Sequence, residues 1–476
     1  MSFAAFRAQS ASDAALSHLV FKVVHTAIAV GIVGAVVFAP PNEATLALDQ
    51  FDGSRILQGH GIATQLGAET FAAVGSPNGA VGWLGALVAD ALAPAGAVLG
   101  TFLATLVALF TFALVERRAR RAGGPLFGVL ATGLAVLCAL GSMGFAGGLV
   151  TAAFAVTLAE ILDRPGKRAA ILATLLAVAW CNVAAQGLFA PALALLFALG
   201  ARLEARGQDV QRWRWMAFGG TALALLATPA FFSYPGIAFE ELRLDRMLQD
   251  IVQFNPIDVA PPAYRVGFLL AMFAAFAIGL PRRIGDVLLF LAAGLLALAN
   301  GTYLPVFGVL IAPLLAASAA AAPPLPTSRP ATARGDVLVA IASVLAAAVL
   351  VTTLVARERP AVPAYALAAT LARDGKPHRL MCLYVDWCDA ALVSGSTTRV
   401  FMDGRVGAYP QRVRDAQLEL VRLAAHWRRT LDADRIDALL TRKDRPLSML
   451  ISLSPGWRAV ASDDVAVLYE RKFVVR

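Results

Sequence analysis

Three carboxylates and one arginine lie close together in the polar segment 40–93, after the first apolar run of the chain: Glu43, Asp49, Asp52 and Arg55. A carboxylate can remove the proton of a hydroxyl group that attacks a substrate, and an arginine can hold a phosphate leaving group. A divalent metal could share that second task. We therefore expect catalytic carboxylates and a substrate-binding arginine here. The alternative is a hydrated loop whose charges only solvate its surface.

A second polar segment, 233–264, contains Glu240 and Arg243 among several other charges. These side chains could line the rim of a groove that binds a lipid carrier. Alternating charges on a helix at a membrane interface can also form a solvated face with pairs four residues apart. Both interpretations stay open at this point.

Asp403 and Arg405 flank a glycine directly after a short strand-like run near the end of the chain. Gly404 permits a tight turn there. The two charged side chains could bind an acceptor substrate. Alternatively, they could pair with each other and brace this part of the chain against the rest.

The composition predicts a membrane protein. Hydrophobic residues make up 58% of the 476 residues and charged residues only 15%, and the mean hydropathy is +0.68. Apolar runs of about twenty residues are long enough to cross a bilayer as helices. We expect about eleven transmembrane helices, at 18–39, 94–115, 124–142, 145–162, 169–187, 188–203, 215–232, 265–281, 285–300, 302–321 and 336–356.

The basic residues between these helices predict the orientation of the chain in the bacterial inner membrane. If successive helices cross the membrane in alternating directions, the basic residues of the connecting segments all lie on the same side. These residues are Arg117, Arg118, Arg120, Arg121, Arg164, Lys167, Arg168, Arg202, Arg206, Arg212, Arg214, Arg282, Arg283, Arg329 and Arg334. The positive-inside rule makes that side the cytoplasm. The N-terminus is then cytoplasmic, and the loops 40–93 and 233–264 and the tail are periplasmic. The net charge of +9 fits such loops, and we expect no nucleic-acid binding because no soluble basic face with aromatic residues is visible.

The composition divides the chain into a transmembrane domain, 1–356, and a polar tail, 357–476. Strand-like runs at 379–385, 399–402, 447–451 and 466–470, with a helical stretch at 410–430, predict a small α/β domain. Cys382 and Cys388 lie in this tail, where they could form a disulfide in an oxidising compartment or stay reduced. Cys138 and Cys181 lie in apolar runs and fit a packing role.

Several segments, taken in order, resemble bacterial membrane glycosyltransferases of the GT-C type, which take a sugar from a polyprenyl-phosphate carrier at the external membrane face. Val400 to Arg405 and then Tyr409 resemble a Phe-x-Asp-Gly-Arg…Tyr signature of a subgroup with an external α/β domain. Further matches are Gly53–Gly61 with Trp83, Trp180–Cys181–Asn182, and Tyr303–Phe307 with Pro313. The resemblance spans nearly the whole chain and implies a GT-C-like fold.

The sequence departs from that subgroup at charged positions. Where the subgroup has an acidic pair and then a histidine in the first external loop, this chain has Glu43, Thr45 and Asp49. Ala184 replaces a mid-chain histidine, and Asn300 replaces a late arginine. The helical frame and the tail are kept while these positions change, a pattern that favours a catalytically inactive relative of the subgroup.

Three functions are compatible with these features. The resemblance implies a glycosyltransferase that transfers a hexose or pentose from a polyprenyl-phosphate donor to an envelope glycan or lipid at the periplasmic face. The departures favour a catalytically inactive scaffold or partner subunit that works with other envelope-biosynthesis proteins. The third function, transport of a lipid-linked substrate, would need intramembrane charges and internal repeats, and the sequence shows little of either.

Overall fold

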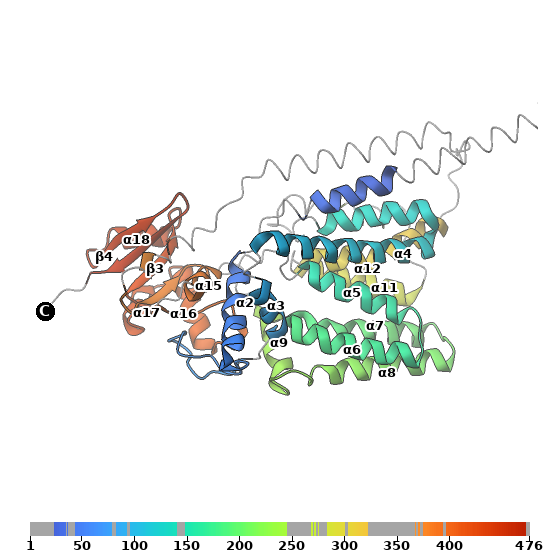
Figure 1. The fold of residues 1–476 in the computed structure, drawn as a ribbon, viewed down its shortest axis with the longest axis horizontal. Helices are drawn as coiled ribbons and strands as arrows, with labels where there is room; N and C mark the ends of the chain where they lie inside the picture. The colour runs from blue at the N-terminus through green and yellow to red at the C-terminus, as the bar shows by residue number, and fades with distance from the viewer. Residues whose placement is uncertain are drawn as a thin grey trace, which may run out of the picture.

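The structure is a computed structural model that describes residues 23–34, 36, 43–78, 82–92, 96–139, 148–244, 268–269, 271–272, 275, 283–299, 303–321, 367, 370–371, 375–393 and 397–472. A bundle of apolar helices forms one part and a small α/β domain, residues 375–472, forms the other (Figure 1). We refer to this second part as the tail domain. The helix α2, Glu43–Arg55, lies between the two parts.

Seven helices make up most of the described bundle: α4 (Gly96–Ala139), α5 (Gly148–Leu162), α6 (Lys167–Val183), α7 (Phe189–Leu203), α8 (Gln208–Ala224), α11 (Ile284–Ala299) and α12 (Leu304–Ala321). The helix α12 is the centre of this core, because nearly all of its residues from Leu304 to Ala316 are buried. Such a helix, apolar all round, can be stable only when other helices or lipid surround it.

The helix α4 is two helices joined by a sharp reversal. Gly124 has φ +85°, which interrupts the helical backbone. A Cβ atom added to Gly128 would lie 2.7 Å from the backbone nitrogen of Arg120, so the chain doubles back on itself. The expected pair of helices in this region is therefore present. The expectation of a basic loop at 117–121 was wrong, because these arginines continue the first helix, where Arg is a good helix former.

Within the described residues, three helical stretches are long and apolar enough to cross a membrane: Leu99–Ala139, which contains the reversal at Gly124, Ala185–Leu203 and Leu304–Ala321. Shorter apolar helices are Val23–Gly34, Trp83–Leu92, Gly148–Leu162 and Ile284–Ala299. The chain is thus mostly helical and carries helices suited to a membrane. The count of eleven transmembrane helices stays a prediction, and the expected helix at 336–356 lies outside the described residues.

The tail domain is a five-stranded mixed sheet with the strand order β2-β1-β3-β5-β4. The strand β1, Arg379–Cys382, pairs in parallel with β2, Arg399–Val400, and with β3, Ala438–Arg442. The strands β4, Trp457–Ser462, and β5, Ala466–Arg471, complete it as antiparallel neighbours. The helices are α15 (Val385–Val393), α16 (Gln411–Val421), α17 (Trp427–Ala433) and α18 (Pro446–Ser452). The expected small α/β domain is confirmed.

Two local expectations in the tail domain were wrong. The segment 447–451 forms helix α18 instead of a strand, with Pro446 in its first turn and Leu447, Ser448 and Ile451 buried. Proline favours a helix start, and this spacing of buried residues follows one helical face. The expected helix at 410–430 is broken into α16 and α17, because Leu423 takes a left-handed conformation with φ +52°.

Cys382 and Cys388 form a disulfide that joins the end of β1 to the helix α15. The sequence left open whether these cysteines are bonded or reduced, and in the structure they are bonded. Cys138 and Cys181 are free and buried, which fits their expected packing role.

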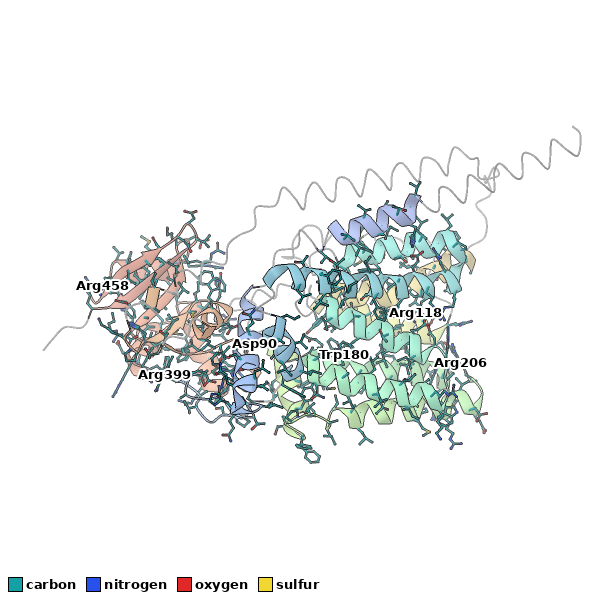
Figure 2. The ribbon with its side chains drawn as sticks, in the orientation of Figure 1. Asp90, Arg118, Trp180, Arg206, Arg399 and Arg458 are labelled. Carbon is teal, nitrogen blue, oxygen red and sulfur yellow. A yellow bond between two sulfur atoms is a disulfide. The ribbon has the colours of Figure 1, made fainter. Side chains whose placement is uncertain are left out.

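The helix α2 approaches the bundle through Gly53, which packs against the helix α3, Trp83–Leu92. A Cβ atom at this glycine would lie 2.2 Å from the Ala86 carbonyl oxygen and 2.7 Å from the Asp90 Cβ atom. Only glycine allows the two helices to come this close. Figure 2 shows Asp90 at the end of the bundle that faces the tail domain.

We predict that Gly53→Ala lowers the free energy of unfolding by about 1–3 kcal/mol, because the added methyl group forces α2 away from α3. Gly100→Ala is the matched control, since a Cβ atom there meets nothing within 4 Å. A helical Gly→Ala change with free space normally stabilises by about 0.5–1 kcal/mol. Thermal unfolding of the detergent-solubilised variants, followed by tryptophan fluorescence, measures both. Equal unfolding temperatures for the two variants would contradict the close packing of α2 against α3.

Candidate functional site

The helix α2 contacts the bundle on one side and the tail domain on the other. It packs along α3 of the bundle and along α15 of the tail domain. Its residues Leu48 and Phe51 pack against a buried cluster of the tail domain that includes Trp387 and Val400. These apolar contacts hold the acidic residues of α2 at the junction of the two parts.

The loop that follows α2 is joined to the edge of the tail-domain sheet by backbone hydrogen bonds. The Val400 N–H donates to the Glu69 carbonyl at 2.8 Å, and the Phe71 N–H donates to the Val400 carbonyl at 3.1 Å. Thr70 pairs in parallel with Val400 as an isolated bridge. Leu66, only 1% exposed, packs into the tail-domain core from this loop. The loop thereby covers the edge strand β2, which would otherwise expose unpaired backbone groups.

Arg405 connects α2, the loop and the tail domain through three carboxylates. Its guanidinium donates to both oxygens of Asp403, with Nε 3.1 Å from Oδ1 and 3.2 Å from Oδ2. Its Nη1 lies 3.3 Å from Asp52 Oδ1, and its Nη2 lies 3.3 Å from Glu69 Oε1. Asp403 is fully buried and Arg405 is 6% exposed. The pairing of Asp403 with Arg405, one of the two alternatives from the sequence, is thus present.

Glu69 links this cluster to Arg55. The Arg55 Nη1 donates to Glu69 Oε1 at 3.0 Å, and the Gly67 N–H donates to the same oxygen at 3.1 Å. The sequence pattern did not single out Glu69 as a site residue. One signal could have found it, because it is the only acidic residue between Asp52 and Asp90.

The turn at Gly404 is fixed by its own contacts. The Gly404 N–H donates to Asp389 Oδ1 at 2.9 Å, and the Asp403 N–H donates to the Tyr409 hydroxyl oxygen at 3.1 Å. Burial raises the pKa of Tyr409 well above its usual value, and the Asp403 charge raises it further. Tyr409 is therefore a neutral hydroxyl in this setting. A Cβ atom at position 404 would lie 2.7 Å from Asp389 Oδ2, so the turn has no room for a side chain.

Asp49 differs from the other carboxylates of the cluster because no ion pair or hydrogen bond is seen for its side chain within the described residues. Burial raises its pKa to about 7, and the Asp52 charge adds to that rise. Burial also raises the pKa of Asp52, which the Arg405 charge opposes. Asp49 can therefore exchange a proton near neutral pH, as a general base requires.

The raised pKa of Asp49 links its protonation to stability. The folded protein holds this proton up to about pH 7, whereas the unfolded chain releases it near the ordinary pKa of 3.8. Between these values the native state binds more protons, so the contribution of Asp49 to stability falls as the pH rises. Near neutral pH the burial of this carboxylate lowers the stability of the fold. A carboxylate that is retained in spite of this loss is a candidate for a functional group.

The remaining residues expected at the site have different positions. Glu43 is the first residue of α2, and Arg243 belongs to the helix α9, Ser233–Leu244, but the side chains of both lie outside the described part. Glu240 on α9 lies 3.9 Å from Arg414 of α16, so it connects the bundle to the tail domain. The structure thus brings Asp49, Asp52, Arg55, Asp403 and Arg405 together with Glu69.

Two segments of the family resemblance meet inside the bundle. The Trp83 Nε1–H donates to Asn182 Oδ1. The Asn182 amide nitrogen donates to the carbonyl oxygens of Val178, at 2.8 Å, and Ala227, at 2.9 Å. This asparagine therefore has its hydrogen bonds satisfied and links α3, α6 and the turn that follows α8. Asn300, another position of the resemblance, lies outside the described residues.

In the described part of the chain, no group of three or more His, Cys, Asp or Glu side chains is placed to hold a metal ion. The carboxylates near Arg405 are compensated by arginines instead. As far as its side chains are described, this paired set of carboxylates does not fit a divalent metal, and we assign no step to one.

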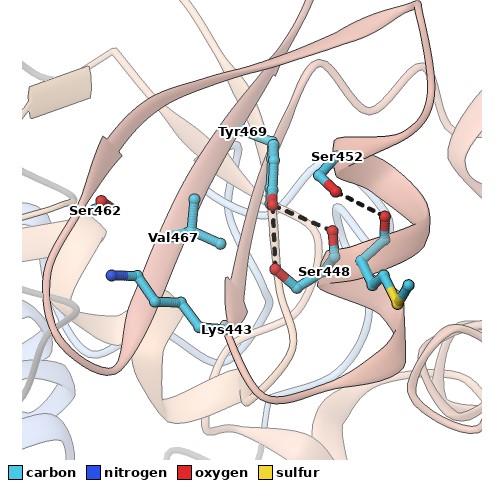
Figure 3. Close-up of a pocket in the computed structure, with 7 residues that line it drawn as sticks. Lys443, Ser448, Ser452, Ser462, Val467 and Tyr469 are labelled. Carbon is cyan, nitrogen blue, oxygen red and sulfur yellow. Dashed lines mark hydrogen bonds between the residues drawn. The ribbon is translucent and has the colours of Figure 1, made fainter.

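A cavity of about 290 Å³ opens elsewhere in the tail domain, lined by residues of α18, β4 and β5 (Figure 3). Its Tyr469 hydroxyl group lies 3.1 Å from the Ser448 hydroxyl and donates to the Ser448 carbonyl. None of the residues expected to do chemistry lines this cavity. We therefore place the candidate site at the α2 junction.

We predict that Arg405→Met destabilises the protein by about 3–5 kcal/mol, because it leaves the buried Asp403 carboxylate without its cation. Arg458→Met is the matched control, since Arg458 pairs with Glu470 at an exposed site. An exposed ion pair contributes about 0–1 kcal/mol. Thermal unfolding compares the two variants with the parent protein. If Arg405→Met unfolds at the same temperature as Arg458→Met, the buried cluster does not hold the parts together.

Comparison with known proteins assigns no family to this arrangement. The chain matches no protein-family model, and no curated protein matches its sequence. The interpretation of the site therefore depends on the positions and charges of its own residues.

Proposed function

We propose that the protein is a membrane glycosyltransferase of the GT-C type. It transfers a sugar from a polyprenyl-phosphate donor to a hydroxyl group of an envelope glycan or lipid. The single observation that carries this proposal is the position of Asp49, a carboxylate on the helix α2 at the junction of the bundle and the tail domain, where burial and the Asp52 charge raise its pKa to about 7. A base with a pKa near the working pH transfers protons most effectively.

The proposed reaction uses this carboxylate in one displacement. Asp49 removes the proton of the acceptor hydroxyl group as its oxygen bonds to the anomeric carbon of the sugar. The bond between that carbon and the phosphate oxygen breaks, and polyprenyl phosphate leaves with the electron pair. The proton on Asp49 then passes to water. The charge of Asp52 raises the proton affinity of Asp49.

Arg55 is the residue that we assign to the donor phosphate. Its side chain is 31% exposed, whereas Arg405 is buried and occupied by Asp403. Glu69 keeps contacts with Arg405 and with the Gly67 N–H, so it stays compensated when Arg55 turns to a phosphate. Asp403 and Arg405 then act as positioning residues. The role of Glu240 and Arg243 at the carrier lipid stays a prediction from the sequence.

Two features support a reaction at the periplasmic face of the inner membrane. Arg118 and Arg206 lie at the end of the bundle away from the tail domain (Figure 2), as the positive-inside rule requires of the cytoplasmic side. The disulfide between Cys382 and Cys388 is typical of an oxidising compartment.

The second candidate is an inactive scaffold in envelope polysaccharide assembly. The observation that favours it is the use of Arg405 within the protein, where it is fully occupied by carboxylates of three segments. In that case the tail domain would present a surface to an active synthase, and Asp49 would have no catalytic role.

We predict that Asp49→Asn lowers the transfer rate by about 10²–10⁴-fold, the contribution typical of a general base. In the parent protein, the rate should rise with pH around a midpoint of about 7, because the carboxylate must be ionised to accept a proton. The variant should lose this rise. Transfer from a polyprenyl-phosphate sugar by the purified protein in detergent measures both quantities. Asp444→Asn, at an exposed site, is the matched control.

Complementation of a deletion strain distinguishes the two candidates. An enzyme requires Asp49, so Asp49→Asn should fail to restore the glycan although it folds. A scaffold should work with Asp49→Asn and fail with Arg405→Met. Full restoration by Asp49→Asn together with Asp52→Asn would refute the catalytic assignment.

A further inference from the structure

A second pocket lies at the end of the bundle away from the tail domain. It has a volume of about 350 Å³ and is lined by His25, Ala113, Glu116, Arg117, Arg120 and Arg121. Most of these residues belong to the last turns before the reversal of α4 at Gly124. Arg118, which marks this end in Figure 2, is buried and bonded to Asp163, so it does not take part in the pocket.

Among the described residues, the arginines near this pocket outnumber the acids that pair with them. Glu160 is shared by Arg121 and, at longer range, by Arg117 and Arg164, at 3.9 Å and 3.6 Å. Glu116 pairs with Arg120 and with His25. Arg117 is 56% exposed and Arg121 is 40% exposed, so both can reach a ligand. An anion at this place would be attracted by the excess of positive charge.

An exposed apolar stripe leads along α4 to these arginines. Phe102 is 56% exposed, Leu106 is 47% exposed and Phe110 is 54% exposed. With 3.6 residues per helical turn, this spacing places them on the same face as Arg117 and Arg121. The surface therefore combines a charged end with an apolar track, as a lipid does.

We propose that this pocket binds the phosphate headgroup of an anionic phospholipid, with an acyl chain along Phe102, Leu106 and Phe110. Basic pockets between helices at a membrane surface suit such headgroups. A zwitterionic phospholipid carries its own cation, which the arginines repel. A free phosphate ion would use the arginines but not the apolar stripe. This site is independent of the proposed glycosyl transfer, because it lies at the other end of the bundle.

Native mass spectrometry of the detergent-purified protein tests the proposal. Dioleoylphosphatidylglycerol is added in one series, dioleoylphosphatidylcholine in a second and inorganic phosphate in a third. We expect phosphatidylglycerol to stay bound and to raise the unfolding temperature, and the other two compounds to do neither. Equal retention of the two lipids would overturn the proposal. If phosphate alone produces the same stabilisation, the site takes a free anion and the lipid assignment is wrong.

Two variants separate the headgroup from the acyl chain. Arg117→Gln removes an exposed cation with little effect on the fold, and we expect it to weaken phosphatidylglycerol binding by about fivefold. Phe110→Ser should weaken lipid binding without introducing any charge. Arg168→Gln is the matched control, since Arg168 is an exposed cation at the start of α6 that does not line the pocket. Unchanged lipid binding in Arg117→Gln, or an equal loss in Arg168→Gln, would contradict this site.

Discussion

The junction of the two parts depends on the charge cluster around Arg405, whose base is the ion pair of Arg405 with Asp403 inside the tail domain. Both side chains are buried, and neither charge is tolerable there without the other. The remaining N–H groups of the Arg405 guanidinium also need hydrogen-bond acceptors. Asp52 and Glu69, which are far away in the sequence, accept these bonds. Burial alone would lower the pKa of Arg405, but the Asp403 and Asp52 charges hold it well above its usual value. The cation is therefore permanent.

The same cluster explains why one carboxylate is left able to change its charge. Arg405 and Arg55 compensate Asp403, Asp52 and Glu69. Asp49 is one helical turn before Asp52, and in the part of the chain that the structure describes no cation pairs with it. Burial and the like charge of Asp52 then favour its protonated form. A rigid network of charges thus fixes the geometry, while the group at its edge can exchange a proton. That combination is what a general base in a preorganised site needs.

Hydropathy and local spacing predicted the apolar helices and the small α/β domain, because both features depend on patterns within one segment of the chain. The catalytic role expected of the acidic residues of α2 rested on their residue types and stays a prediction. Sequence patterns did not predict that Arg405 reaches Asp52, since 353 residues separate them. Glu69 was missed for the same reason: its role comes from a loop that pairs with the sheet edge at Val400. The segment 447–451 was misassigned because a short apolar run does not distinguish a strand from a buried helix.

The central claim is that the loop after α2 and the tail domain form one hydrogen-bonded unit held by Arg405. Amide hydrogen exchange across this junction tests that claim most directly. In the intact protein, the amides of Phe71 and Val400 should exchange slowly, because each donates to the other segment. In Arg405→Met, exchange at both amides should become faster together. Rapid exchange at Phe71 in the parent protein, with Val400 still protected, would contradict the account.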